Sequence, residues 1–133
     1  MLKIPQKIYD EIIAHATEGF PLEVCGILGG REGTVSEIYR MTNTDGSNEH
    51  FMMDPREQFA VAKALRGAGL EMSAIYHSHP ETPARPSEED IRLALTPGVS
   101  HVIVSLATAG EPVVRSFRIS NGAVESEDLI VIP

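Results

Sequence analysis

The chain has 133 residues, a length typical of one domain, and it can bury a hydrophobic core without disulfides. Hydrophobic residues make up 42% of it and charged residues 23%, as in folded globular proteins and unlike disordered chains. The formal net charge of −8 lacks the basic surface that nucleic acids and anionic membranes attract, so we expect neither as a partner.

The cysteine content and the N-terminal segment bear on the compartment. Cys25 is the only cysteine, so no intramolecular disulfide can form and nothing requires an oxidising environment. The segment MLKIPQKIYDEIIAHA lacks a basic stretch followed by a continuous apolar run, and no run of about 18 apolar residues occurs. We therefore expect a cytoplasmic protein in which residues 1–133 form a single domain.

The first third of the chain predicts a helix followed by a hairpin. Between residues 5 and 17, apolar side chains recur at helical spacing while charged side chains occupy other faces, and Gly19 would end the helix. The apolar run at 24–30 and the β-branched run at 34–41 flank a glycine-containing turn, which favours two antiparallel strands. The polar residues at 42–50 favour a loop.

A second helix is predicted after this loop. Asp54 can cap it, Pro55 suits its first position, and Glu57 would complete a capping box. The glycines within residues 67–69 would end it, and the next strand is expected at residues 72–77.

The second half of the chain predicts one more helix and three strands. A proline-rich loop at 80–86 precedes the helix, which Ser87 would cap and Pro97 would stop. Strands are expected at 100–107, 112–119 and 128–133, and the first has the continuous apolar character of a strand buried on both faces. This order of elements predicts an α/β (α+β) fold with a central mixed β-sheet flanked by helices.

The segment Tyr76-His77-Ser78-His79-Pro80 ends a predicted strand and carries the chemistry. Residues two apart in a strand project from the same face, so His77 and His79 can direct both imidazoles at one point. Asp90, expected at the third position of the next helix, can face back toward the strand end. Two imidazoles and one carboxylate leave a fourth tetrahedral position for water, as in catalytic zinc sites.

Each part of this pattern also has a purely structural interpretation. A His-x-His pair alone is more often ordinary surface or hydrogen-bonded histidine than a metal site. A serine followed three residues later by an acidic residue is a common helix start. The metal site is favoured because the pair, the proline-rich loop and the capped helix occur together at one particular spacing.

The combined motif resembles that of the JAMM (MPN-plus) zinc metallopeptidases, especially their small free-standing bacterial members. That motif has an upstream Glu, a His-Ser/Thr-His-Pro segment, a Ser that seven residues separate from the second His, then two residues and an Asp. Here Pro80 to Pro86 are the seven residues, followed by Ser87 and Asp90. The segment PLEVCGILGG resembles the part that holds the family's Glu, which would be Glu23, and Asn43 with FMMDPREQF resembles bacterial members.

The resemblance covers almost the whole chain and implies a cytidine-deaminase-like JAMM/MPN fold. It also implies a zinc-dependent (iso)peptidase that hydrolyses an amide bond at the C-terminal Gly-Gly tail of a ubiquitin-like or sulfur-carrier protein. One Zn²⁺ with a catalytic water would be held by His77, His79 and Asp90, and Glu23 would act as general base. Ser87 resembles the family serine that hydrogen-bonds the developing oxyanion.

Three other interpretations stay open at this point. A two-His, one-carboxylate site also describes non-haem iron enzymes, although three capped helices disagree with the all-β barrels that usually hold such sites. A non-catalytic MPN-type binding scaffold is the second, and here every ligand position is filled. A RadC-like protein is the third; an Asn typically separates its two histidines, whereas Ser78 stands here.

The remaining histidines and the cysteine are not expected to join the site. Cys25 lies in an apolar run and is interpreted as a small core residue. His15, His50 and His101 have no partner at ligand spacing and are expected to be structural or exposed. His50 is the strongest exception, because it lies in a polar loop. Glu23 alone would be read as solvated surface, so only the resemblance assigns it a role.

Overall fold

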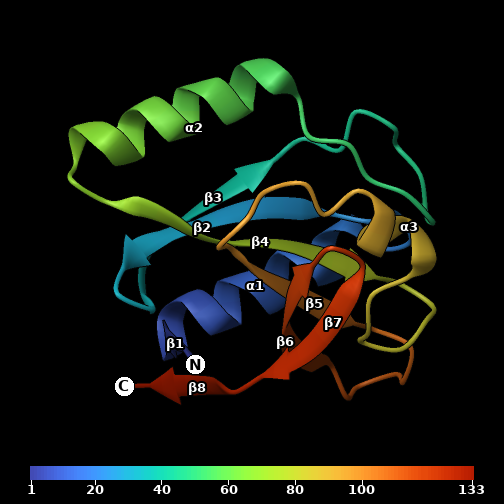
Figure 1. Cartoon of the computed structure of the whole chain (residues 1–133). Helices are drawn as coiled ribbons and strands as arrows, with labels where there is room; N and C mark the ends of the chain where they lie inside the picture. The colour runs from blue at the N-terminus through green and yellow to red at the C-terminus, as the bar shows by residue number, and fades with distance from the viewer.

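The computed structural model describes residues 1–133 and contains one eight-stranded sheet with helices on both faces (Figure 1). The elements follow one another in this order: β1 (Leu2–Pro5), α1 (Gln6–Gly19), β2 (Cys25–Arg31), β3 (Thr34–Met41), α2 (Pro55–Gly67), β4 (Glu71–His79), α3 (Glu88–Arg92), β5 (Ser100–Ser105), β6 (Val113–Ser120), β7 (Ala123–Glu127) and β8 (Leu129–Ile132). The predicted α/β architecture is therefore confirmed.

The sheet is mixed, and β4 lies in its interior. The strand order is β7-β6-β5-β4-β2-β3-β1-β8. The predicted β2–β3 hairpin is antiparallel, β2 also pairs antiparallel with β4, and β4 runs parallel to β5. His77 is opposite Cys25 on one side and Ile103 on the other. Both neighbours therefore hold the strand end that carries the two histidines.

The two faces of the sheet pack against different helices. The face toward α1 buries a cluster that includes Ile12, Ala16 and Tyr76. The opposite face packs against α2 through a cluster that includes Val61 and Leu65. Each fully buried Ile, Leu or Val contributes roughly 1.5–3 kcal/mol to folding. These two clusters fix the sheet from both sides.

The capping of α2 differs in part from the prediction. Asp54 caps this helix by accepting a hydrogen bond from the backbone N–H of Arg56, as expected. The predicted capping box with Glu57 is wrong. The Glu57 carboxylate instead accepts hydrogen bonds from the backbone N–H and the hydroxyl of Thr42, at 2.7 and 2.8 Å. Glu57 therefore ties α2 to the loop that follows β3.

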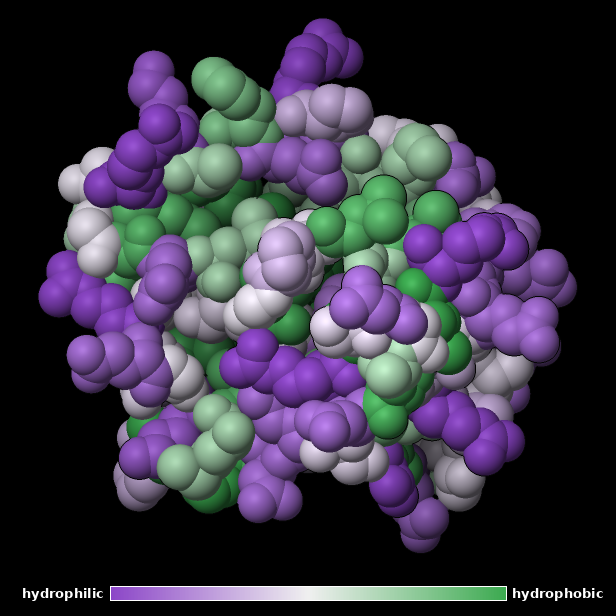
Figure 2. All heavy atoms as spheres, in the orientation of Figure 1, coloured by the Kyte–Doolittle hydropathy of each residue, from purple (hydrophilic) through white to green (hydrophobic).

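Some element boundaries also differ from the prediction. The third helix is predicted over residues 87–95 with a stop at Pro97, but α3 ends at Arg92. β1 and β7 are absent from the prediction: β1 has only four residues, and none of the five residues of β7 is buried, so this strand has no apolar alternation. None of the three helices is long and apolar enough to cross a membrane. Figure 2 shows hydrophobic residues among hydrophilic ones on the face that holds α2 and α3.

Candidate metal centre

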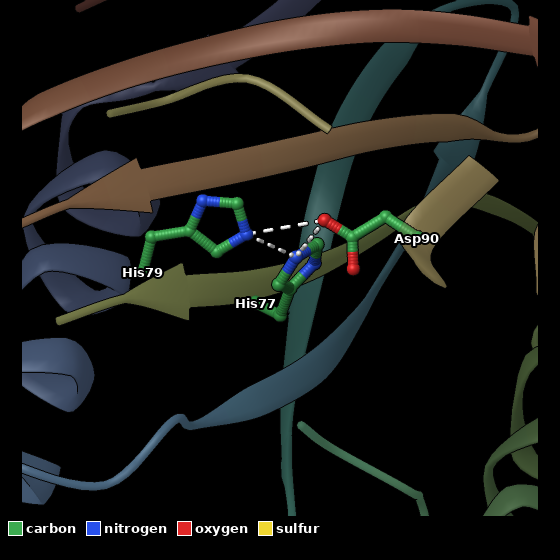
Figure 3. A group of neighbouring side chains, drawn as sticks. All are labelled: His77, His79 and Asp90. Carbon is green, nitrogen blue, oxygen red and sulfur yellow. Dashed lines mark hydrogen bonds and ion pairs between the residues drawn. The ribbon is translucent and has the colours of Figure 1, made fainter. Parts of the chain in front are cut away.

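The side chains of His77, His79 and Asp90 converge at the carboxyl end of β4 (Figure 3). The two histidine Nε2 atoms lie 3.1 Å apart, and Oδ2 of Asp90 lies 3.1 Å from each of them. The possible ligand atoms of the three residues all lie within 4.8 Å of one another. The structure thus brings together the three predicted ligands, two from β4 and one from the first turn of α3.

The chemistry of these donor atoms fits a metal ion. Nδ1 of His79 lies 2.9 Å from the carbonyl oxygen of Pro83, to which it can only donate, so in the neutral ring Nε2 carries the lone pair. That atom lies against His77 Nε2 and the Asp90 carboxylate. Two imidazole nitrogens and a carboxylate match the ligands of zinc, and a carbonyl behind a ligating histidine is its usual partner.

The Asp90 carboxylate is oriented by the start of its own helix. The backbone N–H of Ser87 donates to Asp90 Oδ2 at 2.9 Å, and the N–H of Asp90 donates to Ser87 Oγ at 3.0 Å. Burial opposes ionisation of Asp90, but hydrogen bonds from His77, His79 and Ser87 hold its pKa well below the usual range. The motif serine thus caps its helix, as the sequence predicts, and the structure adds that the serine and aspartate form a reciprocal capping box.

Electrostatics favour positive charge among the three side chains. Burial alone would lower the pKa of His79, but the hydrogen bond to Asp90 and the Pro83 carbonyl outweigh it, so the pKa is raised. Together with the lowered pKa of Asp90, this shift favours a cation between the ligand atoms, which a proton or a metal ion can supply.

Glu23 lies in a pocket that adjoins this cluster. The pocket has a volume of about 250 Å³ and is lined by Glu23, His79 and Ser87, among others. Glu23 is 6% exposed, and no protein group donates a hydrogen bond to its carboxylate. Burial raises the pKa of Glu23 to about 8, against an opposing effect of His79 and with a contribution from Asp90. Such a carboxyl group is suited to exchange a proton near neutral pH.

Backbone hydrogen bonds fix the segment that carries Glu23. Ser78, which stands between the two histidines, accepts a hydrogen bond from Val24 N at 2.8 Å and donates its own N–H to Val24 O at 3.0 Å. The N–H of Glu23 donates to Ser47 O at 2.8 Å, and its carbonyl accepts from Asn43 Nδ2 at 3.0 Å. The motif residues Ser78 and Asn43 therefore position Glu23, a role that becomes visible only in three dimensions.

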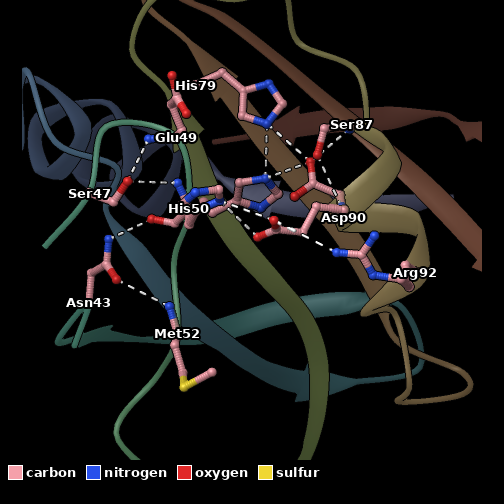
Figure 4. Close-up of polar contacts among 11 residues, drawn as sticks. Asn43, Ser47, Glu49, His50, Met52, His79, Ser87, Asp90 and Arg92 are labelled. Atoms are coloured by element: carbon pink, nitrogen blue, oxygen red, sulfur yellow. Dashed lines mark hydrogen bonds and ion pairs between the residues drawn. The ribbon is translucent and has the colours of Figure 1, made fainter. Parts of the chain in front are cut away.

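Three further side chains surround the cluster. The ring of Phe51 stacks on that of His77, with centroids 4.6 Å apart and planes at 24°. His50 Nδ1 lies 3.1 Å from the Glu89 carboxylate and so links the loop after β3 to α3 (Figure 4). His101 lines a second pocket together with His77. His101 could not be placed here from its sequence position, because only the pairing of β4 with β5 brings it to this pocket.

Cys25 and His15 lie outside the cluster, as predicted. Cys25 is fully buried in the core under α2, and burial raises the pKa of its thiol to about 12, so the reactive thiolate is strongly disfavoured. His15 lies on the α1 face, where its Nδ1 is 2.7 Å from the hydroxyl of Tyr76. Neither residue reaches the three ligand atoms.

The mixed sheet and the strand-end histidine pair together define a protein of the JAB/MPN class, and comparison with known proteins agrees. The family described as prokaryotic homologs of the JAB domain matches residues 5–120. This chain belongs to that family.

Curated relatives are similar over most of their length. The CysO-cysteine peptidase of Mycobacterium tuberculosis is 36% identical over 134 residues, which cover 99% of this chain and 92% of that protein. The desampylase of Haloferax volcanii is 35% identical over 126 residues, covering 87% of this chain and 91% of that protein. Family membership together with a relative that is a peptidase by name indicates a hydrolase.

Solved structures confirm the fold. A protein from Desulfitobacterium hafniense, whose structure was determined in solution, is 46% identical with a TM-score of 0.90 and covers 99% of this chain and 93% of its own. A JAB1/MPN domain protein from Archaeoglobus fulgidus has a TM-score of 0.67 at 22% identity and covers 98% of this chain and 97% of its own. The second likeness concerns the fold alone.

Proposed function

We propose that this protein is a zinc-dependent peptidase that hydrolyses the amide bond after the C-terminal Gly-Gly of a ubiquitin-like or sulfur-carrier protein. The observation that carries this proposal is the convergence of His77, His79 and Asp90 within 4.8 Å, beside the buried carboxyl group of Glu23. The names of the relatives support the substrate class, since they include a CysO-cysteine peptidase and a probable TtuB-protein conjugate cleaving protease from Thermus thermophilus.

The ligand set would be Nε2 of His77, Nε2 of His79 and a carboxylate oxygen of Asp90. When bound, zinc supplies Lewis-acid activation of the attacking water and the scissile carbonyl, and its charge favours the ionised form of Glu23. One sheet carries both the ligands and the segment of the base, so we propose that residues 1–133 act as a single domain.

Two other side chains would carry the proton and the developing charge. Glu23 accepts a proton from the attacking water and returns it to the leaving amine. Ser87 Oγ already accepts a hydrogen bond from the backbone N–H of Asp90, so its own hydrogen is free to be donated to the scissile carbonyl oxygen. A donor of this kind contributes about 3 kcal/mol to transition-state stabilisation.

The test is cleavage of a small carrier protein that ends in Gly-Gly followed by one extra residue, read by mass spectrometry. The zinc-loaded protein should release that residue and leave the Gly-Gly terminus. Chelation should abolish the reaction, and Glu23→Gln should lower kcat by about 10²- to 10⁴-fold, the usual contribution of a general base.

Metal analysis of the same samples separates the alternatives. Glu23→Gln should still bind one zinc ion, so that its loss of activity reports on the proton transfer alone. Full activity of Glu23→Gln, or activity that follows iron content and not zinc, would contradict the proposal. Binding of the carrier without cleavage by the folded, zinc-loaded protein would support the scaffold interpretation instead.

A further inference from the structure

A second pocket adjoins the ligand cluster on the side of His77. It has a volume of about 270 Å³, reaches His77 and Asp90, and shares no lining residue with the pocket of Glu23. Its apolar walls come from the loop before α2, from β4 and from the end of α3: Phe51, Met52, Met53, Ile75 and Leu93. An apolar pocket with a few polar groups, directly beside the proposed ligands, has the character of a substrate subsite.

We infer that this pocket holds the side chain of the residue that is released from the Gly-Gly tail, and that His101 helps to select that residue. The inference rests on the proposed function. The two glycines have no side chains, and the residue before them lies about 7 Å of extended chain from the scissile carbonyl. The released residue therefore supplies the only side chain next to the bond that is cleaved.

The lining residues define which side chain fits. Phe51 and the two methionines are polarisable and adapt to apolar or sulfur-containing groups. Glu89 also lines the pocket, so a carboxylate there would meet a like charge and would exchange water for largely apolar walls. The volume accommodates one side chain of medium size. An uncharged, largely apolar side chain is therefore favoured over an acidic one.

His101 adds a polar requirement. Its Nε2 is shielded from solvent and has no hydrogen-bond partner in the protein, a condition it shares only with Ser100 Oγ among buried side-chain atoms. Buried polar atoms are nearly always paired. A thiol, thioether or hydroxyl group of the occupant would complete this site once the flexible methionine side chains of the pocket shift and expose Nε2. The released residue that fits best is an uncharged one with a sulfur or hydroxyl group, such as methionine or cysteine.

The experiment compares carriers that end in Gly-Gly-X, with kcat/KM measured for X as methionine, norleucine, cysteine, aspartate and glycine. Norleucine has the shape of methionine without the sulfur, so the ratio of the two isolates the polar requirement. Methionine should exceed norleucine by about fivefold, as for one hydrogen bond, and should exceed aspartate by at least about tenfold. His101→Phe should remove the preference for methionine over norleucine while both are still cleaved.

A matched control and a binding measurement keep the outcomes distinct. Phe59→Ala, on the exposed side of α2, should leave every ratio unchanged, since Phe59 is 69% exposed and lines a different pocket. NMR titration of the metal-free protein with free methionine should perturb the His101 ring and the Met52 and Met53 methyl groups. Free aspartate should not.

Equal kcat/KM for all carriers would overturn the role of this pocket and leave the proposed peptidase function intact. Absence of cleavage for every carrier would instead overturn the proposed function. In that event the titration still decides, because methionine that leaves the His101 and methionine signals unmoved would overturn the pocket assignment as well.

Discussion

Alternate residues of β4 face two different environments, and only one of them holds the candidate chemistry. His77 and His79 face α3 and the two pockets, whereas Tyr76 and Ser78 are fully buried toward α1. On the α1 side, the hydroxyl of Tyr76 contacts His15, and Ser78 bonds the backbone of Val24. Side chains alternate with a period of two, so a one-residue slip of β4 would exchange the two sets.

The difference shows how this strand separates stability from chemistry. Close packing constrains the α1 side. A Cβ atom at Gly26, opposite Tyr76, would overlap the Tyr76 ring, so no larger residue fits there. The other side is fixed by charge, since three ionisable groups meet beside a buried carboxyl group. We therefore expect changes on the α3 side to remove activity, and changes on the α1 side mainly to lower the free energy of unfolding.

The largest effect is expected for Asp90→Asn. The amide keeps the size of the side chain but removes the charge that favours a cation between the histidines, so zinc affinity should fall and kcat/KM should drop on the order of 10³-fold or more. Metal analysis and kcat/KM measure these effects. Glu88→Gln, the same chemical change at an exposed site in α3, should alter neither. Normal zinc content in Asp90→Asn would show that Asp90 is not a metal ligand and that the α3 side of β4 does not hold the metal as proposed.

The next effect concerns stability: ionisation of Glu23 should lower the free energy of unfolding of the metal-free protein as the pH rises. The folded-state pKa is raised from 4.5 to about 8, so the folded protein binds this proton more tightly than the unfolded chain does. Its contribution to stability is therefore present at low pH and is lost as the pH rises from about 4.5 to 8. The full loss amounts to at most about 5 kcal/mol, at about 1.4 kcal/mol for each pKa unit.

Urea unfolding of metal-free wild type and Glu23→Gln at pH 5 and pH 8 measures this effect. The variant has no carboxyl group to ionise, so its advantage over the wild type should grow between the two pH values. Saturating zinc should shrink that difference, because the cation favours the carboxylate. A pH-independent difference between the two proteins would show that Glu23 is not buried as the structure has it.

An intermediate effect is expected for Ser78→Ala. Ser78 is buried on the α1 side of β4, but it holds the segment that carries Glu23 on the other side. The change leaves the buried N–H of Val24 without its partner, which should lower the free energy of unfolding by about 1–3 kcal/mol. The segment of Glu23 is then held less firmly, so kcat should fall by about tenfold at unchanged zinc content. Ser73→Ala is the control, because Ser73 lies earlier in β4 and its side chain makes no hydrogen bond. Equal losses of kcat in the two variants would show that Ser78 does not position Glu23.

The sequence predicts much of this arrangement, because the patterns that specify it are local. The alternation around His77, the Ser87 cap and the Asp54 cap all depend on neighbouring residues, and the structure has them where expected. The positions of Glu57 and His101 could not be obtained in this way. Glu57 binds Thr42 across a loop, and His101 reaches the second pocket only through the register of β5 against β4.

The smallest effect is expected for Tyr76→Phe, and it tests the separation of the two sides most directly. The change removes only the hydroxyl that lies 2.7 Å from His15 Nδ1, so the free energy of unfolding should fall by about 1 kcal/mol. Zinc content and kcat/KM should stay within about twofold, because the hydroxyl and the ligand atoms lie on opposite faces of the sheet.

Denaturant unfolding and kcat/KM are measured for Tyr76→Phe. Tyr9→Phe is the control, because it removes a hydroxyl group that makes no hydrogen bond. A tenfold loss of kcat/KM at normal zinc content would show that the α1 side adjusts the geometry of His77 through the backbone they share. A change confined to unfolding would mean that alternation along one strand is enough to keep the packing of Tyr76 independent of the chemistry next to it.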